Sequence, residues 1–486
     1  MAKQVYPVEE WIEEATVDEL QQAMESGERT AAELVLAYMA RIAAYDKQGP
    51  ALNAVLELNP DALAIAERRS QGPRGPLHGV PVLLKDNIDT ADKMHTSAGS
   101  LALEGHYAAS DAFLVKRLRE AGAVILGKAN MTEWANYMTQ GMPGGYSSRG
   151  GQVLNAYGPK FGAGGSSTGS GVAVAANLCT LAAGTETSGS ILSPAASSSV
   201  VGIKPTLGLI SRSGIVPLAH SQDTAGPLAR TVADAALLLG AMAGTDPADP
   251  ITGASLGRVP ADYRQFLEKD GLQGARIGIP RAVYHDKLGE EERRAFEAHI
   301  AALRLTGADV VDPADIASAQ ELASFNSSVF RYEFKADVNA YLSKLAPHLP
   351  VHSLREVIAF NAKHFEKTLK YGQITLMRAE ETSGTLAEAE YMRDRLKDLR
   401  LSLAEGIDAV MARHRLDALL FPGTAGAAIA AKAGYPSIAV PGGYAADGRP
   451  LGVTFTGQAY SEHVLIRLAY AFEQLGSQRR KPVWPK

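Results

Sequence analysis

The stretch from residue 161 to residue 203 constrains the fold of this 486-residue chain more than any other. It contains one charged side chain, Glu186, and is dominated by glycine, serine, alanine and threonine. A flexible Gly/Ser linker has such a composition, but here the apolar runs AVAANLCTLAA and VVGIK are interleaved with the small residues. Two compatible interpretations remain: a core packed tightly with small residues, or a buried site where backbone amides approach a substrate closely, which requires glycine.

The flanking sequence indicates an α/β protein. Residues 80–84 (VPVLL) predict a short buried strand, and residues 111–122 predict an amphipathic helix that leads into a strand at 123–127. Three further strand-like runs, DALLFPG, YPSIAVPGG and LGVTFTG, lie within 417–457. This alternation predicts a central mixed β-sheet flanked by helices on both faces.

The domain organisation follows from length and composition. The length allows two or three domains, but large α/β enzymes often form one, and we expect residues 1–486 to form a single domain. Residues 1–70 predict an N-terminal helical segment, and residues 316–415 predict a charged helical flank or cap. The Pro/Gly-rich connection 245–263 is the best candidate boundary.

Composition excludes several classes of protein. The net charge is −5 and there is no basic stripe, so nucleic acid is not an expected partner. The start MAKQVYPVEEW lacks the pattern of a secretory signal, and no apolar run is long enough to span a membrane, so we expect a cytoplasmic protein. The single cysteine, Cys179, excludes an internal disulfide framework and a cysteine-rich metal site. The sequence leaves the oligomeric state open.

Few residues in the sequence are good candidates for a catalytic nucleophile or a general base. Cys179 lies in an apolar run without a neighbouring base, which is typical of a buried, inert thiol. No G-x-S-x-G elbow stands in a strand–turn–helix context, and there is no H-E-x-x-H pattern. His78 and His220 are the histidines nearest to the segment 161–203, and each is interpreted as structural.

One lysine and two serine-containing turns remain. Lys85 ends the apolar run in VPVLLKDN, where a buried charge needs a partner or a lowered pKa, and a neutral lysine is a usable base. GAGGSSTGSG places Ser166 and Ser167 on a glycine-rich turn. TETSGSILSP places Ser190 on a tight turn whose N–H groups can converge on an anion. These residues predict a serine hydrolase that uses lysine.

The same motifs resemble those of the amidase signature family. GAGGSSTGSG, TETSGSILSP and GIKPTLGLISRSGIVP match its core pattern, and GVPVLLKDNID, TSAGS, GKANMTEW, AGYPSIAVPGG and LGVTFTG match in order and spacing. The match covers residues 70–243 and 417–475, while YEFKADVNAYL and SLREVIAFN resemble the peptide-amidase-like branch. The resemblance implies the amidase signature fold and hydrolysis of amides, and no pattern calls for a cofactor or a metal.

The resemblance also implies a catalytic set of Lys85, Ser166 and Ser190. Neutral Lys85 would accept a proton from Ser166, which takes one from the nucleophile Ser190. Ser166 would then protonate the leaving nitrogen, and water would hydrolyse the acyl-enzyme by the same relay. The peptide bond before Ser166 is expected to be cis. The expected oxyanion donors are the backbone N–H groups of Thr187, Ser188, Gly189 and Ser190, and the expected substrate-binding residues are Asn130, Met131, Gly165 and Leu192.

Departures from the family pattern bear on the substrate. Glu186 occupies a position where the family usually has Asp, and Ser188 occupies a position where it has Gly. Leu192 occupies a position where many members have Arg. Leucine offers no charge, which favours a neutral, partly apolar substrate. C-terminal peptide amides, aryl acylamides, polyamide oligomers and carbamate (urethane) esters all fit this expectation, and the same machinery could cleave esters.

Two other functions are compatible with the family. The A subunit of the glutamyl-tRNA amidotransferase would need partner subunits and glutamine, and Leu192 argues against it. The second alternative is a catalytically inactive member of the family that serves as a binding protein or scaffold. The presence of Lys85, Ser166 and Ser190 argues against this alternative.

Overall fold

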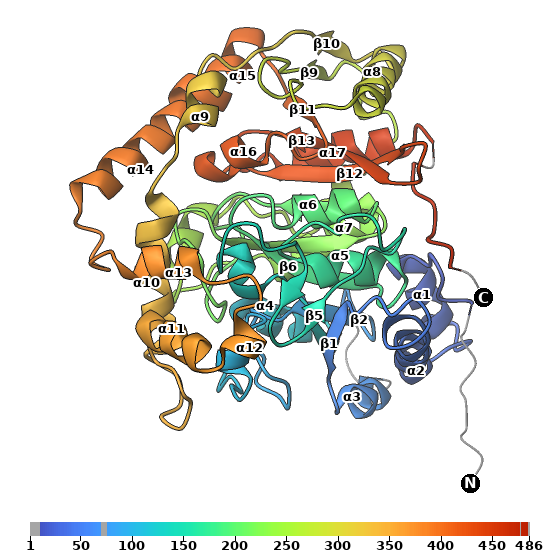
Figure 1. The fold of residues 1–486 in the computed structure, drawn as a ribbon. Helices are drawn as coiled ribbons and strands as arrows, with labels where there is room; N and C mark the ends of the chain where they lie inside the picture. The colour runs from blue at the N-terminus through green and yellow to red at the C-terminus, as the bar shows by residue number, and fades with distance from the viewer. Residues whose placement is uncertain (1–9, 70–74, 477, 485–486) are drawn as a thin grey trace.

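The computed structural model describes residues 10–69, 75–476 and 478–484. Within them, eleven strands form one sheet in the order β1-β3-β2-β6-β8-β7-β12-β13-β11-β9-β10, which runs through the whole molecule (Figure 1). A separate pair joins β4 (Tyr146–Ser147) to β5 (Gly151–Gln152). The strands of the large sheet are β1 (Val55–Leu58), β2 (Pro81–Lys85), β3 (Val124–Ala129), β6 (Leu181–Glu186), β7 (Val201–Lys204), β8 (Thr224–Ala229), β9 (Arg276–Gly278), β10 (Asp309–Val311), β11 (Ala418–Pro422), β12 (Ser437–Tyr444) and β13 (Pro450–Thr456).

The sheet is mixed, as predicted from the sequence. Strand β2 pairs in parallel with both β3 and β6. From β6 to β11 every neighbouring pair is antiparallel, and β11, β9 and β10 are again parallel to one another. Strands β2 and β6 are parallel, with Leu84 opposite Ala183. The residues at the carboxyl ends of the two strands therefore lie side by side.

Helices cover both faces of the sheet. Side chains of a strand alternate between faces, so Val82 and Leu84 join one core while Leu83 joins the other. The first core includes α4 (Phe113–Glu120), α7 (Val232–Met242), α8 (Glu290–Leu305) and α17 (Glu462–Glu473). The second includes α2 (Ala31–Arg41), α3 (Ala62–Arg69), α5 (Thr168–Ala175) and α6 (Leu192–Ser197).

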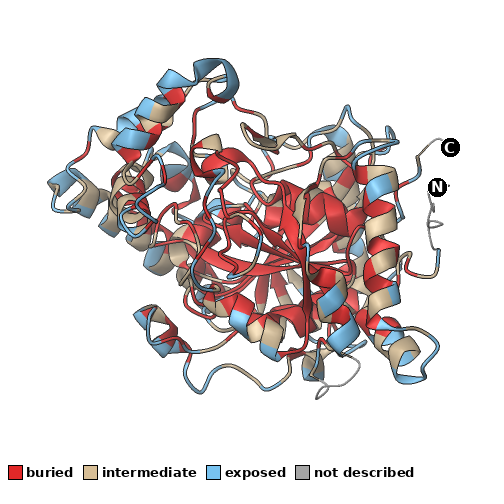
Figure 2. Cartoon of the chain, turned by 90° about the horizontal axis from the view of Figure 1, so that it is seen from below, coloured by how far each residue is buried: buried red, intermediate tan, exposed pale blue. Residues whose placement is uncertain are grey.

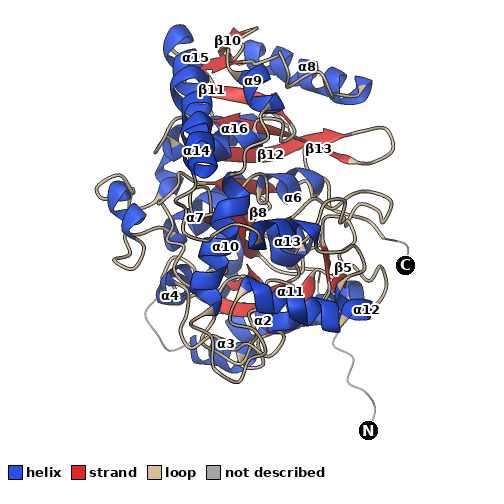
Figure 3. Cartoon of the chain, turned by 60° about the vertical axis from the view of Figure 1, so that its left-hand side comes forward, coloured by secondary structure: helices blue, strands red, loops and turns tan. Residues whose placement is uncertain are grey.

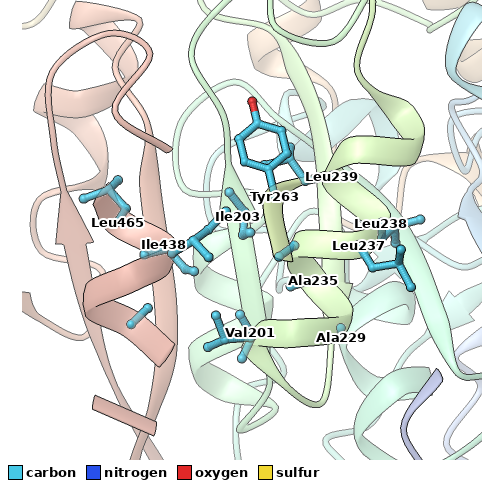
Figure 4. Packing of buried hydrophobic residues seen from close by; sticks show 14 of the residues in the cluster. Val201, Ile203, Ala229, Ala235, Leu237, Leu238, Leu239, Tyr263, Ile438 and Leu465 are labelled. Atoms are coloured by element: carbon cyan, nitrogen blue, oxygen red, sulfur yellow. The ribbon is translucent and has the colours of Figure 1, made fainter. Parts of the chain in front are cut away.

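Burial is concentrated at the sheet (Figure 2). Figure 4 shows how α7 packs, with Leu239 close to Tyr263 and with Ile203 between α7 and Ile438 of β12. The chain segment 161–203 lies almost entirely in these cores, so the small residues do pack tightly, as one interpretation of the sequence required.

The N-terminal segment 1–70 is not purely helical. It holds α1 (Val17–Glu25), α2 and α3, but β1 also lies in it and pairs antiparallel with β3 at the edge of the large sheet. Four residues are too few for periodicity to separate a strand from a helix, which explains the error. Residues 1–9 lie outside the described part of the chain.

Residues 316–415 form a helical flank on one side of the sheet (Figures 1 and 3). Helices α10 (Val329–Leu342), α11 (Leu354–Lys363) and α13 (Ile374–Glu380) pack a third hydrophobic cluster against Leu103, Trp134 and Met138. In the described residues no helix is long and apolar enough to cross a membrane. The helices from this flank onward are α9 (Ala319–Ser324), α10 (Val329–Leu342), α11 (Leu354–Lys363), α12 (Phe365–Thr368), α13 (Ile374–Glu380), α14 (Ala389–Ser402), α15 (Asp408–His414) and α16 (Ala427–Ala433).

Candidate active site

Lys85 is the last residue of β2 and is fully buried. Its Nζ lies 2.8 Å from Ser166 Oγ, 2.8 Å from Thr185 Oγ1 and 3.0 Å from the carbonyl oxygen of Thr185. Burial lowers the pKa of Lys85 to about 7, although the nearby charges of Asp223 and Glu186 act in the opposite direction. The side chain is thus a buried amine that loses its proton close to neutral pH.

Ser166 lies on the glycine-rich loop just before α5. The Gly165–Ser166 peptide bond is cis, as the family resemblance predicts. A Cβ at Gly165 would lie 2.7 Å from Thr132 Oγ1, so a side chain does not fit there. The N–H of Ser167 donates to the carbonyl oxygen of Ser190 at 3.1 Å. The structure therefore brings Lys85 and Ser166 into contact and ties their loop to the turn that carries Ser190.

The turn around Ser190 is held by the carboxylate of Glu186. This carboxylate accepts hydrogen bonds from the N–H groups of Gly189 at 2.7 Å, Ile191 at 2.7 Å and Leu192 at 3.0 Å. Gly189 has a φ of 81°, in the left-handed region that glycine adopts without strain. The Ser190 side chain itself is only slightly accessible, because the residue is 7% exposed.

This arrangement corrects the set of four expected oxyanion donors. The N–H of Gly189 is already bonded to Glu186, so it is not free for a substrate oxygen. Within the described chain, the N–H groups of Thr187, Ser188 and Ser190 make no hydrogen bond to protein atoms. Three of the four expected donors therefore remain available.

Asp223 supports the same turn from the other side. Its carboxylate accepts a hydrogen bond of 2.5 Å from the Thr187 hydroxyl and two more from the N–H groups of Leu218 and Ala219. Burial raises the pKa of Asp223 to about 6, and these hydrogen bonds act against that rise. The turn is thus fixed between two buried carboxyl groups.

Three of the expected substrate-binding residues occupy structural positions instead. The Asn130 side chain is fully buried, and its polar atoms bond Asn53, Gly150, Met131 and Ser147. Met131 is buried in the cluster beneath the helical flank. Leu192 is buried in the core between α6 and the sheet. Tertiary packing that the sequence does not reveal turns these side chains inward, whereas Gly165 is partly accessible.

Two residues of the site, Thr185 and Asp223, have no signal in the sequence that marks them as functional. Thr185 follows Gly184 within β6 and meets Lys85 because β6 lies beside β2 in parallel. The order of strands in a sheet cannot be read from a single sequence, so nothing pointed to this pair. Asp223 lies in the stretch HSQDTAGP, close to the family motifs in sequence, yet its bond to Thr187 depends on the turn geometry.

Among the described residues, one group of side chains has the composition of a metal site. His220, Glu333 and Asp337 bring their ligand atoms within 4.8 Å of one another. His220 Nδ1 lies 2.9 Å from Asp337 and its Nε2 lies 3.7 Å from Glu333, which is the geometry of ion pairing. The group joins α10 to the loop that carries Asp223, and His220 and Asp337 line the same pocket as Thr185 and Thr187.

Comparison with known proteins identifies the family. The family model described as Amidase matches residues 33–466, so the chain belongs to the amidase family, a class of amide-hydrolysing enzymes. It is 42% identical over 485 residues to a probable amidase of Arabidopsis thaliana, a match covering 97% of this chain and 92% of that protein. The solved structure of native peptide amidase from Stenotrophomonas maltophilia matches with a TM-score of 0.92 and 47% identity, covering 97% of this chain and 99% of that one.

A more distant relative bears on one alternative function. The glutamyl-tRNA(Gln) amidotransferase of Alkalilimnicola ehrlichii has an A subunit that is 33% identical over 497 residues, covering 96% of this chain and 98% of that protein. The likeness to the peptide amidase structure confirms the predicted fold class, a large mixed sheet flanked by helices.

Proposed function

We propose that this chain hydrolyses a carboxylic amide bond of a neutral, partly apolar substrate, with Ser190 as nucleophile and Ser166 and Lys85 as proton relay. The observation that carries the proposal is the buried contact of 2.8 Å between Lys85 Nζ and Ser166 Oγ in a member of the amidase family. A base works best when its pKa lies near the working pH, and that of Lys85 is about 7.

The hydrogen-bonding capacity of a neutral lysine supports this assignment. A neutral amine has two N–H donors and one lone pair. The carbonyl oxygen of Thr185 can only accept, and Thr185 Oγ1 takes the second N–H. The lone pair is then left for the hydroxyl proton of Ser166, which is the proton a general base must take.

The reaction then has two halves. Ser190 Oγ attacks the carbonyl carbon as its proton passes to Ser166 and the Ser166 proton passes to Lys85. The free N–H groups of Thr187, Ser188 and Ser190 stabilise the oxyanion. The C–N bond breaks as Ser166 returns a proton to the leaving nitrogen. Water attacks the acyl-Ser190 ester by the same relay and releases the acid.

A peptide amide is the substrate that the comparisons favour. The structure that is 47% identical is that of a peptide amidase, whereas the amidotransferase relative is 33% identical. We therefore place the C-terminal amide of a neutral peptide first, ahead of aryl acylamides, polyamide oligomers and carbamate esters, which need the same acyl-transfer chemistry.

The purified chain can be tested with one panel of substrates: a neutral peptide amide, p-nitroacetanilide and a phenyl carbamate. Ser190→Ala should lower kcat by at least about a thousandfold, while Ser343→Ala on the exposed flank should keep wild-type rates. A fluorophosphonate should label Ser190. Hydrolysis without partner subunits or glutamine would exclude the amidotransferase role. Inactivity on the whole panel would contradict the proposal and favour the scaffold role.

A further inference from the structure

A cleft of about 680 Å³ lies between α6, α8, α9 and α16, the helices labelled in Figure 1. Helix α6 contributes Ser193, Ala196 and Ser197 to its wall. The N–H of Ser193 donates to the carbonyl oxygen of Gly189 at 2.7 Å, so the first helical turn already includes Ser190. With 3.6 residues per turn, positions 190, 193 and 197 share one face of the helix. The cleft therefore follows the face of α6 that points back along the chain toward Ser190.

The loop after β11 also joins the cleft to the Ser190 turn. Its residues from Pro422 to Ala425 line the cleft. A methyl group placed on Gly189 would lie 3.7 Å from the Cβ of Ala427, the first residue of α16, so the helix that follows this loop lies close to the Ser190 turn. The cleft thus begins beside the Ser190 turn, and a substrate bound at Ser190 can extend toward it.

The wall combines apolar surface with hydroxyl groups that have no protein partner. Within the described chain, the side-chain hydroxyls of Tyr284, Ser193, Ser197 and Thr424 make no hydrogen bond to protein atoms. The Tyr284 ring packs against Phe421 with centroids 4.9 Å apart, and burial raises the pKa of Tyr284. Apolar side chains lie beside these hydroxyls: Leu288, Phe296, Leu322 and Ile429. Such a wall suits a ligand that alternates amide groups with apolar side chains.

The charges around the cleft largely cancel. Glu292 pairs with Arg449 at 3.0 Å, and Lys432 pairs with the buried Asp398. A cleft with balanced charges attracts neither an anionic nor a cationic chain. This balance favours a neutral occupant.

We propose that the cleft binds the acyl side of the substrate, a neutral oligopeptide whose C-terminal amide reaches Ser190. The proposal rests on the proposed function and adds the location and length of the substrate site. From Ser190 to Ser197 the helix rises about 10 Å, which an extended chain covers with about three residues. In this proposal the Tyr284 hydroxyl forms a hydrogen bond with the backbone of the bound peptide.

The experiment measures kcat/KM for N-acetylated, neutral peptide amides of one to four residues. With the wild type, kcat/KM should rise to about three residues and then level off. Ala295 lines the cleft from α8, whereas Ala298, one turn further, is exposed to solvent. Ala295→Phe should lower the ratio of kcat/KM between the three-residue and one-residue substrates at least about fivefold, and Ala298→Phe should keep the wild-type ratio. Tyr284→Phe should lower the same ratio about two- to tenfold.

The outcomes separate this proposal from the proposed function. The rate of fluorophosphonate labelling of Ser190 needs no acyl chain, so it reports whether each variant is folded with its nucleophile in place. Normal labelling of Ala295→Phe with an unchanged length ratio would overturn the cleft proposal and leave the amidase proposal standing. Failure of the wild type to hydrolyse any amide would instead overturn the proposed function.

Discussion

Lys85 Nζ and Thr185 Oγ1 lie 2.8 Å apart at the ends of two neighbouring parallel strands. Asn87 Nδ2 donates to the same hydroxyl oxygen at 3.0 Å. Thr185→Val removes this acceptor while keeping the shape, so the amine loses one of the contacts that orient it toward Ser166. We expect kcat to fall about tenfold, the loss of roughly one buried hydrogen bond, with circular dichroism confirming the fold.

The control is the same substitution at Thr180, just before the same strand. The Thr180 hydroxyl donates to Tyr38 at 2.9 Å and touches neither Lys85 nor Ser190. Thr180→Val should lower the free energy of unfolding by about 1 kcal/mol without changing kcat. Equal kcat values for Thr185→Val and Thr180→Val would contradict the role assigned to Thr185.

Activity should depend on the protonation of Lys85. Its pKa is about 7, and only the neutral amine can accept a proton, so kcat/KM should rise with pH up to about 7 and then level off. Glu186 raises the pKa of Lys85 through its charge. Glu186→Gln should therefore move the rising limb to lower pH, whereas Glu104→Gln at an exposed position should not. Rate measurements from about pH 5 to about pH 9 test this, and a limb that moves to higher pH would refute it.

The Glu186 carboxylate should also matter for stability. It accepts three backbone N–H groups, and an amide in its place cannot accept with both of its atoms. We expect Glu186→Gln to lower the free energy of unfolding by about 2–4 kcal/mol, measured in urea. Glu462 is also buried and accepts one N–H, from Thr206 at 2.6 Å. Glu462→Gln should cost less, and the reverse order would be evidence against this role of Glu186.

The ion pair between His220 and Asp337 should make attachment of α10 sensitive to pH. The hydrogen bond to Asp337 raises the pKa of His220 above its ordinary value of 6.5. The stabilisation is therefore fully present below about pH 6.5 and is lost as the pH rises through the higher value of the folded state. Amide exchange is itself base-catalysed, so the quantity to measure is the protection factor of the α10 amides, which should fall over that range in the wild type. Because the imidazole is 44% exposed, the effect should be small.

The variant His220→Gln removes the titrating imidazole from this ion pair. In His220→Gln, the protection factors of the α10 amides should be lower than in the wild type at low pH and should no longer fall above pH 6.5. A variant that keeps the wild-type pH dependence would assign it to another group, and Asp89, which has a pKa of about 6 and accepts a hydrogen bond from Tyr341 of α10, is then the candidate.

Cys179 should be unreactive in the folded protein. The side chain is fully buried, and burial raises the pKa of the thiol to about 12, so no thiolate is available at neutral pH. Iodoacetamide should leave the native chain unmodified and should label one thiol after denaturation. Rapid labelling of the native protein would show that Cys179 becomes exposed.

The sequence was sufficient to predict the parts of the fold and site that depend on local pattern. The apolar run before Lys85, the helix over residues 111–122 and the glycine-rich turns around Ser166 and Ser190 all have short-range signals, and the structure has the corresponding elements. The edge strand β1 was missed because its signal is only four residues long.

What the sequence could not provide is the arrangement of segments that are distant along the chain. The contact between Lys85 and Thr185 requires β2 to lie beside β6, and the inward positions of Asn130 and Leu192 require the packing of loops and helices around them. Family patterns align residues one by one, so they marked Leu192 as different without revealing that its side chain lies in the core.

The position of β12 and β13 has a consequence for synthesis of the protein. These two strands, residues 437–456, lie inside the sheet between β7 and β11, although they are the last strands to leave the ribosome. Until they emerge, β7 presents an unpaired edge, and such edges favour intermolecular pairing. A nascent chain that stalls before residue 437 therefore cannot complete its sheet, although it already contains Lys85, Ser166 and Ser190, and its β7 edge stays open to pairing with other chains.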